Sequence, residues 1–422
     1  AIVVAHLLVF FAAALVCHVQ LARTRPGSGR LTEFYLWLGL GGALGGAFNA
    51  FIGPRLFTSV LEYPLALAAV VMLVPATRGD SRVRVGDVGW PVLVGVLGAG
   101  IPMILQLTGA SLPISPRLLL VVPAAACLAF SGRPLRFGLG VAAVILASTA
   151  YPSEIGSIEH AERNFFGVHR VLRDEEAGFR WLTHGTTVHG GQRLSERDDP
   201  TPLTYYHPTG PLGDLFADFA PVDVGVIGLG AGAMVHYGRA GQSWTFYEID
   251  PAVVAIAREP RYFTFLHRAR PQVRVVVGDA RLTLAADSAA RLDLIVLDAF
   301  GSDAIPVHLL TTEAVGLYLA RLRPEGRLAM HLSNRFLDLA PLAAALARSA
   351  SLHALERIDL DEDEATGKYR SHWVVFARDS SALATLPRRH GWRPLQDRTV
   401  RVWTDDYSSV LPLFRRSDAA TP

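Results

Sequence analysis

Apolar residues are concentrated in the first part of this chain of 422 residues. Residues 1–150 are mostly Leu, Val, Ala, Gly and Phe, and charged residues occur in short breaks between apolar runs. The runs at 2–21, 34–57 and 88–109 are long enough, or nearly so, to cross a bilayer as helices. Shorter runs lie at 63–75, 118–130 and 137–150. We therefore predict a multi-pass helical membrane region over residues 1–150, with the lipid bilayer as a partner.

The hydrophobic pattern changes after residue 150. Residues 151–215 contain short strand-like pieces at 165–171 and 179–182, and we interpret Gly185, Gly190 and Gly191 as turn residues. This segment is too short to build a core of its own. We predict that it forms a small β appendage on the domain that follows it.

From residue 216 onward, strands and helices alternate. We expect apolar strands at 222–228, 244–249, 273–277, 292–298, 326–332 and 372–377, and helices at 251–258, 312–322 and 339–350. Continuous apolar strands joined by helical crossovers indicate a parallel sheet that is covered on both faces. The ligand site of such a sheet lies at the carboxyl ends of the strands, near the switch in strand order. We therefore predict a Rossmann-like α/β domain over residues 216–422.

Charge and cysteine content exclude several classes of function. The formal net charge of +2 creates no strong field, so we expect no nucleic-acid partner. Cys17 and Cys127 both lie in apolar runs, which excludes a disulfide framework and a cysteine zinc site. His184 and His189 could form a metal pair, but no third ligand has suitable spacing, and we predict no metal.

A glycine-rich turn follows the first strand of the α/β domain. Gly228, Gly230 and Gly232 let the backbone approach a nucleotide, and the helix expected after them offers free N–H groups. The next strand ends in Glu248, and a carboxylate roughly 20 residues after the glycines can accept both ribose hydroxyls. The turn also fits the dinucleotide pattern through Ala233, so an NAD-binding domain remains an alternative.

Acidic residues follow the third and fourth strands and favour an S-adenosyl nucleotide. Asp279 and Ala280 come directly after a buried strand, where an adenine amino group could be recognised. Asp298 and Asp303 follow a fully apolar strand and place two carboxylates at the mouth of the site. Asp298 is poorly solvated there, so it could act as a base for an incoming amine or fix its ammonium form. The alternative is that both acids only cap turns. We interpret His331 as packed or hydrogen-bonded.

Several motifs together resemble the spermidine synthase (polyamine aminopropyltransferase) family, especially its membrane-fused bacterial branch. They cover most of the chain, and their combination is far more specific than any one of them. The matching stretches are HGTTVHGGQ at 184–192, Tyr205-Tyr206, the glycine turn, YEID at 247–250, GDA at 278–280, LDAFGSDAIP at 297–306, HLSN at 331–334, WTDDY at 403–407, and EYPLAL at 62–67 in the membrane region.

The resemblance implies a fold of the class I S-adenosylmethionine-dependent transferase type and an aminopropyltransferase activity. Decarboxylated S-adenosylmethionine would donate an aminopropyl group to a small amine of the putrescine kind, releasing methylthioadenosine. Asp298 would deprotonate or orient the amine, and Asp303 would be the second acid, two residues further along than is usual. Gln192 and Tyr206 would line the donor and acceptor pocket. In the same way, Glu248 would hold the ribose and Asp279 the adenine end.

Position 231 departs from the family pattern. The glycine turn of the family usually reads GGGDGG, and its Asp holds the ammonium of the donor, whereas this chain has Ala231 there. A lost charge-assisted hydrogen bond costs about 1.5–3 kcal/mol, or roughly ten- to a hundredfold in affinity. Methyl transfer from ordinary S-adenosylmethionine is therefore an alternative. A non-catalytic nucleotide-binding module on a membrane scaffold is another.

The resemblance also implies a location and an assembly. We expect a protein of the bacterial inner membrane, and the family suggests a homodimer. The positive-inside rule would place the arginine-rich breaks at 23–30, 78–84 and 133–136 in the cytoplasm. If all six apolar runs crossed, the soluble half would then lie outside. We nevertheless expect it in the cytoplasm, because the donor is supplied there. The glycines between Gly39 and Gly46 form a bare stripe that suits close helix contact in lipid.

Overall fold

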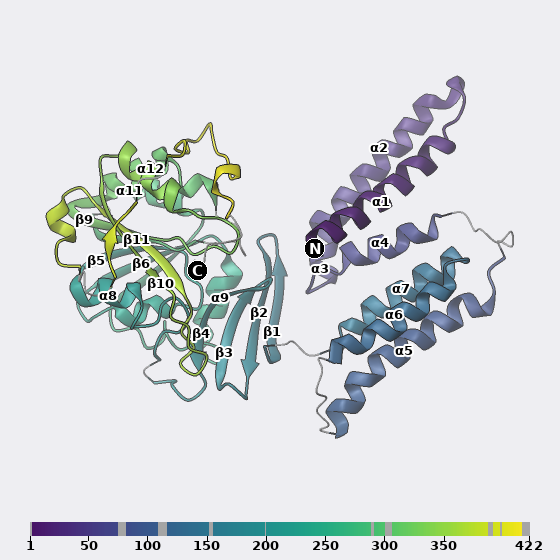
Figure 1. Cartoon of the computed structure of the whole chain (residues 1–422), viewed down its shortest axis with the longest axis horizontal. Helices are drawn as coiled ribbons and strands as arrows, with labels where there is room; N and C mark the ends of the chain where they lie inside the picture. The colour runs from purple at the N-terminus through teal and green to yellow at the C-terminus, as the bar shows by residue number, and fades with distance from the viewer. Residues whose placement is uncertain are drawn as a thin grey trace. The chain divides into compact units, whose positions relative to one another are not determined.

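The computed structural model of the chain is drawn in Figure 1. The structure describes residues 2–74, 82–108, 116–151, 155–198, 200–287, 291–299, 306–386, 391–396 and 399–415. The chain divides into two compact units. The first unit comprises Ala1–Glu154 and Arg163–Phe165, and the second comprises Ile155–Glu162 and Phe166–Pro422. The finer division of the second part into residues 151–215 and 216–422 stays a prediction. Each unit is described by itself.

Helices make up the first unit. Its segments Val4–Arg23, Ser28–Leu56 and Val85–Leu105 are long and apolar enough to cross a membrane. Helices thus form at all six apolar runs, and the membrane insertion of these helices stays a prediction. The elements are α1 (Ile2–Arg23), η1 (Ser28–Arg30), α2 (Leu31–Ala47), the π-helix η2 (Phe48–Ile52), α3 (Gly53–Leu56), α4 (Glu62–Met72), α5 (Val85–Thr108), η3 (Pro116–Leu120), α6 (Val121–Cys127), η4 (Leu128–Phe130) and α7 (Pro134–Ser148).

Small residues bring α5 and α7 together, and they are not the ones that the sequence indicated. A Cβ atom added to Gly95 would lie 3.2 Å from the Cβ of Ala143, and one added to Gly98 would lie 3.0 Å from the Cβ of Ala147. The glycines between Gly39 and Gly46, by contrast, face no described atom within 4 Å. The prediction of a helix contact at that stripe is therefore wrong within the described residues.

A small antiparallel sheet opens the second part of the chain, and its strands pair in the order β1-β2-β3-β4. Gly185 lies in the turn between β3 and β4, as predicted, but Gly190 and Gly191 lie inside β4. A Cβ on Gly191 would lie 2.3 Å from the ring of Trp181, so only glycine lets β4 pass this ring. The strands are β1 (Ser157–Asn164), β2 (Gly167–Asp174), β3 (Phe179–His184) and β4 (Thr187–Arg193).

The main sheet has the order β12-β10-β11-β9-β8-β5-β6-β7. Strands β7, β6, β5, β8 and β9 are parallel, whereas β11 is antiparallel to both β9 and β10. The sheet is therefore mixed, and the prediction of a purely parallel sheet is wrong at this edge. The strands are β5 (Asp223–Ile227), β6 (Ser243–Glu248), β7 (Gln272–Val277), β8 (Leu292–Leu297), β9 (Leu322–His331), β10 (His353–Asp359), β11 (Ser371–Ala377) and β12 (Arg393–Pro394).

Both faces of the main sheet are covered, as predicted. Val224 and Val226 of β5 pack in a core with residues of α8 and α9, while Ile227 packs in a second core with residues of α11 and α12. The helices are α8 (Pro211–Asp218), η5 (Ala233–Tyr237), α9 (Pro251–Arg258), α10 (Ala280–Ala286), η6 (Val307–Leu309), α11 (Thr312–Arg321), α12 (Ala340–Ser349), η7 (Ser380–Leu383) and η9 (Leu411–Leu413).

The segment after the glycine turn differs from the expected α-helix. Residues Ala233–Tyr237 form a short 3-10 helix, and Gly232 precedes it in the left-handed region with φ +81°. The helix at residues 251–258, which follows the next strand, is confirmed as α9. The glycine turn therefore offers its own backbone to a ligand, without the regular N-terminus of a long helix behind it.

Candidate functional site

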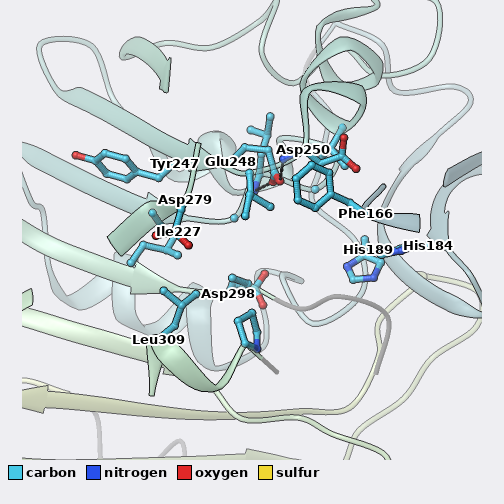
Figure 2. A pocket seen from close by; sticks show the side chains of 18 of the residues that line it. Phe166, His184, His189, Ile227, Tyr247, Glu248, Asp250, Asp279, Asp298 and Leu309 are labelled. Atoms are coloured by element: carbon cyan, nitrogen blue, oxygen red, sulfur yellow. Dashed lines mark hydrogen bonds between the residues drawn. The ribbon is translucent and has the colours of Figure 1, made fainter. Parts of the chain in front are cut away.

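A cavity of about 260 Å³ lies at the carboxyl ends of β5, β6, β7 and β8. Its position is the predicted one, because β5 lies between β6 and β8, where the strand order switches direction. The small sheet forms another part of its wall through His169, Leu182, His184 and His189. In Figure 2, His184 and His189 lie together, while Glu248, Asp279 and Asp298 come from the strand ends.

Two glycines of the turn line the cavity and allow close backbone contacts. Gly228 has φ +100°, and a Cβ added there would lie 2.2 Å from the carbonyl oxygen of Asp298. Gly230 has φ +54°, and its Cβ would lie 2.5 Å from the carbonyl oxygen of His189. Any larger residue would push the turn away from β8 and β4. Gly232 is not part of the described cavity wall.

Glu248, at the end of β6, faces the cavity next to this turn. Its two carboxylate oxygens each accept a backbone N–H bond of 2.9 Å, from Leu229 and from Asp250. Burial raises the pKa of the Glu248 carboxyl, while the two N–H donors act in the opposite direction. Each oxygen keeps a further lone pair. The carboxylate can therefore accept hydrogen bonds from a ligand without losing its own anchors.

Asp279 and Ala280 lie together on the cavity wall where β7 leads into α10. One oxygen of Asp279 caps α10 by accepting a 2.9 Å bond from the N–H of Leu282. Its other oxygen lies 2.9 Å from Nε2 of His308, which also lines the cavity. Local pattern did not indicate His308 as a site residue, because His308 lies outside the motif that contains Asp279.

Asp298 directly follows β8, and each of its two carboxylate oxygens contacts another side chain. The hydroxyl of Tyr206 donates to Oδ2, and Nδ1 of His331 lies 2.7 Å from Oδ1. Burial, reinforced by the charge of Asp298, raises the pKa of Tyr206 well above its usual range, so this phenol remains a neutral donor. Asp298 and Tyr206, named from separate motifs, therefore meet at one point of the cavity wall.

His331 extends this contact away from the cavity. Its Nε2 lies 2.7 Å from the hydroxyl of Ser333, and its ring stacks against Tyr205 at 4.3 Å and Trp373 at 4.7 Å. An ionised carboxylate only accepts, so Nδ1 of His331 donates to Asp298 whenever that carboxyl is ionised. The stacked rings hold the imidazole in this orientation. His331 is hydrogen-bonded, as expected, and its partner is the acid to which the sequence analysis assigned catalysis.

Gln192 is not part of the described cavity wall, and its polar atoms have other partners. Gln192 is buried, its Nε2 donates to Oγ1 of Thr264 at 2.9 Å, and its Oε1 accepts from the N–H of Thr264 at 2.8 Å. It ties β4 to the segment after α9 and is not part of the described cavity wall. Its expected contact with a donor therefore lacks support in the geometry. Asp303 lies outside the described residues.

Three histidines of the small sheet line the cavity. The rings of His169 and His184 are 4.6 Å apart, and those of His184 and His189 are 5.7 Å apart. Nε2 of His169 lies 2.6 Å from Oδ2 of Asp250, whereas Nε2 of His189 is buried without a hydrogen-bond partner among the described residues. Burial lowers the pKa of His189 to about 4. Within the described residues, no group of metal-binding side chains has the geometry to hold an ion.

The pKa of His189 predicts a pH dependence of stability. The pKa is about 4 in the folded chain against an ordinary 6.5, so the unfolded chain takes up this proton first as the pH falls. The free energy of unfolding is therefore unaffected by this group above pH 6.5. It falls progressively between pH 6.5 and about pH 4, by up to ~3 kcal/mol, because protonation of His189 favours the unfolded chain. Thermal unfolding of wild type and His189→Phe at neutral pH and at about pH 5 tests this. The variant should lose less stability on acidification, and equal losses would contradict the assignment.

Comparison with known proteins supports the motif-based resemblance over part of the chain. No family model matches the sequence. A curated polyamine aminopropyltransferase of Vibrio vulnificus (strain CMCP6) is 31% identical over 182 residues, which are 40% of this chain and 58% of the relative. The chain thus matches less than two thirds of that relative's length. Over these residues, the resemblance to the polyamine aminopropyltransferase family is confirmed.

Solved structures overlap with the chain more loosely. A probable spermidine synthase from Corynebacterium glutamicum ATCC 13032 gives a TM-score of 0.40 at 17% identity, covering 53% of this chain and 80% of that one. Spermidine synthase from Thermotoga maritima gives 0.40 at 12% identity, covering 59% and 81%. Scores of this size carry no argument about the site, which rests on the contacts described above.

Proposed function

We propose that this chain, a relative of polyamine aminopropyltransferases, transfers an aminopropyl group from decarboxylated S-adenosylmethionine to a small amine. The observation that carries the proposal is the cavity at the strand ends, where Asp298 is held by Tyr206 and His331. Glu248 offers a carboxylate for the ribose in the same cavity, and Asp279 and Ala280 lie where the adenine would bind. Gly228 and Gly230 let the backbone reach the nucleotide.

The charge of the cavity supports ligands that carry ammonium groups. Its described wall contains the carboxyl groups of Glu248, Asp250, Asp279 and Asp298, and no lysine or arginine. An aminopropyl donor and an amine acceptor both bring positive charge into this wall. Ordinary S-adenosylmethionine would bring a carboxylate to this wall, whose described residues include no lysine or arginine to pair with it.

The transfer requires one proton abstraction and one displacement. Asp298 takes a proton from the acceptor ammonium, which frees the lone pair of the nitrogen. The nitrogen then attacks the propyl carbon that is bonded to the sulfonium, the new C–N bond forms, and the C–S bond breaks. The bonding electrons return to sulfur, which leaves as the neutral thioether of methylthioadenosine. Catalysis is therefore mainly positioning and deprotonation.

A methyltransferase that uses ordinary S-adenosylmethionine is the second candidate, and Ala231 is the feature that favours it. Calorimetric titration of the purified chain with S-adenosylmethionine, its decarboxylated form and methylthioadenosine separates the two. We expect tighter binding of the decarboxylated donor. A preference for S-adenosylmethionine would support methyl transfer, and binding without turnover of any amine would support a non-catalytic nucleotide-binding module.

We also propose that the first unit anchors the enzyme in the bacterial inner membrane, with the catalytic part in the cytoplasm. Large apolar side chains on its helices are exposed, among them Leu36, Trp37 and Phe51. Three of its segments have the length and composition of membrane spans. Alkaline carbonate extraction of membranes should leave the chain in the pellet. Release into the supernatant would contradict insertion.

His331 should act as a positioning residue for Asp298. His331→Phe keeps an aromatic ring between Tyr205 and Trp373 but removes the donor to the carboxylate. We expect kcat to fall by roughly ten- to a hundredfold, the worth of one hydrogen bond to a charged group, with little change in the KM for the amine. His331→Asn places an amide N–H near the position of Nδ1 and should recover part of kcat. Equal loss in both variants would indicate a purely structural role.

A further inference from the structure

The charged end of the donor chain needs a partner that position 231 does not provide. Ala231 is fully buried and is not part of the described cavity wall. Its Cβ lies 3.0 Å from the place that a Cβ on Gly190 would occupy, so this position is packed against β4. The methyl group of Ala231 therefore packs against β4 and offers no polar atom to the donor chain.

His189, the residue before Gly190, is on the cavity side of this contact. Its imidazole lines the cavity, and its carbonyl oxygen lies against the glycine turn at Gly230. The carboxyl group of Asp298 lines the same cavity. Nε2 of His189 is buried and has no hydrogen-bond partner among the described residues. A buried polar atom in this state calls for a ligand that supplies the missing partner.

The chemistry of this nitrogen suits an ammonium donor. The imidazole is neutral at pH 7 because burial lowers its pKa to about 4, and a neutral imidazole has one nitrogen that accepts. An ammonium group offers three N–H donors. A carboxylate, by contrast, would enter a described wall that has four carboxyl groups, on Glu248, Asp250, Asp279 and Asp298, and no lysine or arginine.

We propose that Nε2 of His189 accepts a hydrogen bond from the terminal ammonium of the donor chain, which makes His189 the residue that selects a donor ending in an ammonium group alone. This inference rests on the proposed function and assigns to β4 the role that the glycine turn lacks. His184, next to it on β3, supports the ring without contacting the ammonium.

The experiment compares two ligands that differ in this ammonium. Calorimetry on the full chain measures decarboxylated S-adenosylmethionine, which has the aminopropyl chain, and methylthioadenosine, which lacks it. His189→Phe should lower the affinity for decarboxylated S-adenosylmethionine by roughly ten- to a hundredfold. The affinity for methylthioadenosine should stay within about twofold of the wild-type value. His189→Gln, which keeps an acceptor oxygen, should lose less. His353→Phe, a change at an exposed histidine outside the described cavity wall, is the matched control and should leave the ratio of the two affinities unchanged.

The outcomes separate this inference from the proposed function. Equal weakening of both ligands by His189→Phe, or no weakening of either, would overturn the role of His189 while the proposed function stood. If His189→Phe does not fold, His189→Leu, which also lacks an acceptor, takes its place with the same expected result. A wild-type preference for S-adenosylmethionine over the decarboxylated donor would overturn this inference together with the proposed aminopropyl transfer. Failure of the wild-type chain to bind any adenosyl ligand would overturn both proposals.

Discussion

Replacing Asp298 with Asn is expected to lower the rate of aminopropyl transfer by about two to four orders of magnitude, the contribution of a general base. The asparagine has the size of the aspartate, but its amide cannot take a proton from the acceptor. Its NH2 group would also meet one of two donors, the hydroxyl of Tyr206 or Nδ1–H of His331. Single-turnover measurement of methylthioadenosine release reports this step directly.

The control for Asp298→Asn is the same change at Asp223. Asp223 lies at the start of β5, whereas the cavity lies at the carboxyl end of this strand. Its carboxylate forms an ion pair with Arg323 at 2.8 Å. Asp223→Asn should keep the wild-type rate. Asp298→Asn should also keep its affinity for methylthioadenosine within about threefold, since the adenosyl end is held elsewhere. A rate within tenfold of wild type would exclude Asp298 as the base.

Replacing Glu248 with Gln is expected to weaken methylthioadenosine binding by roughly ten- to a hundredfold. Each oxygen of Glu248 accepts a backbone N–H, from Leu229 or from Asp250. The NH2 group of a glutamine would face one of these N–H donors, so one backbone hydrogen bond to the turn would be lost. The hydrogen bonds to the ribose would be weakened as well. Calorimetry on the variant and on Glu259→Gln, an acid outside the described cavity wall, measures the effect. Equal affinities would show that Glu248 does not contact the ribose.

The positions of the acids could be predicted because they depend on local pattern. Glu248, Asp279 and Asp298 each end or follow an apolar strand, and parallel strands bring their carboxyl ends to one edge of a sheet. The structure places all three on one cavity. Local sequence also indicated the glycine turn, although not that its glycines make room for neighbouring backbone as well as for a ligand.

The partners of these acids could not be predicted from local pattern. Tyr206 is 92 residues from Asp298 and His331 is 33 residues away, so their meeting depends on strand order and on side-chain packing. Strand β10, near one edge of the main sheet, was not predicted for a related reason. Strand β10 mixes apolar and charged residues along His353–Asp359, whereas the expected strands were continuous apolar runs. The sheet is mixed because β11 runs antiparallel to both of its neighbours, β9 and β10.

Product analysis of the purified chain distinguishes aminopropyl transfer from the other proposed reactions. The chain is incubated with decarboxylated S-adenosylmethionine and a panel of diamines, and the products are identified by mass spectrometry. We expect methylthioadenosine and an aminopropylated amine in equal amounts, formed only when both substrates are present and lost in Asp298→Asn. No aminopropylated product with any amine, or methylated amine and S-adenosylhomocysteine formed from ordinary S-adenosylmethionine, would contradict the proposed aminopropyl transfer.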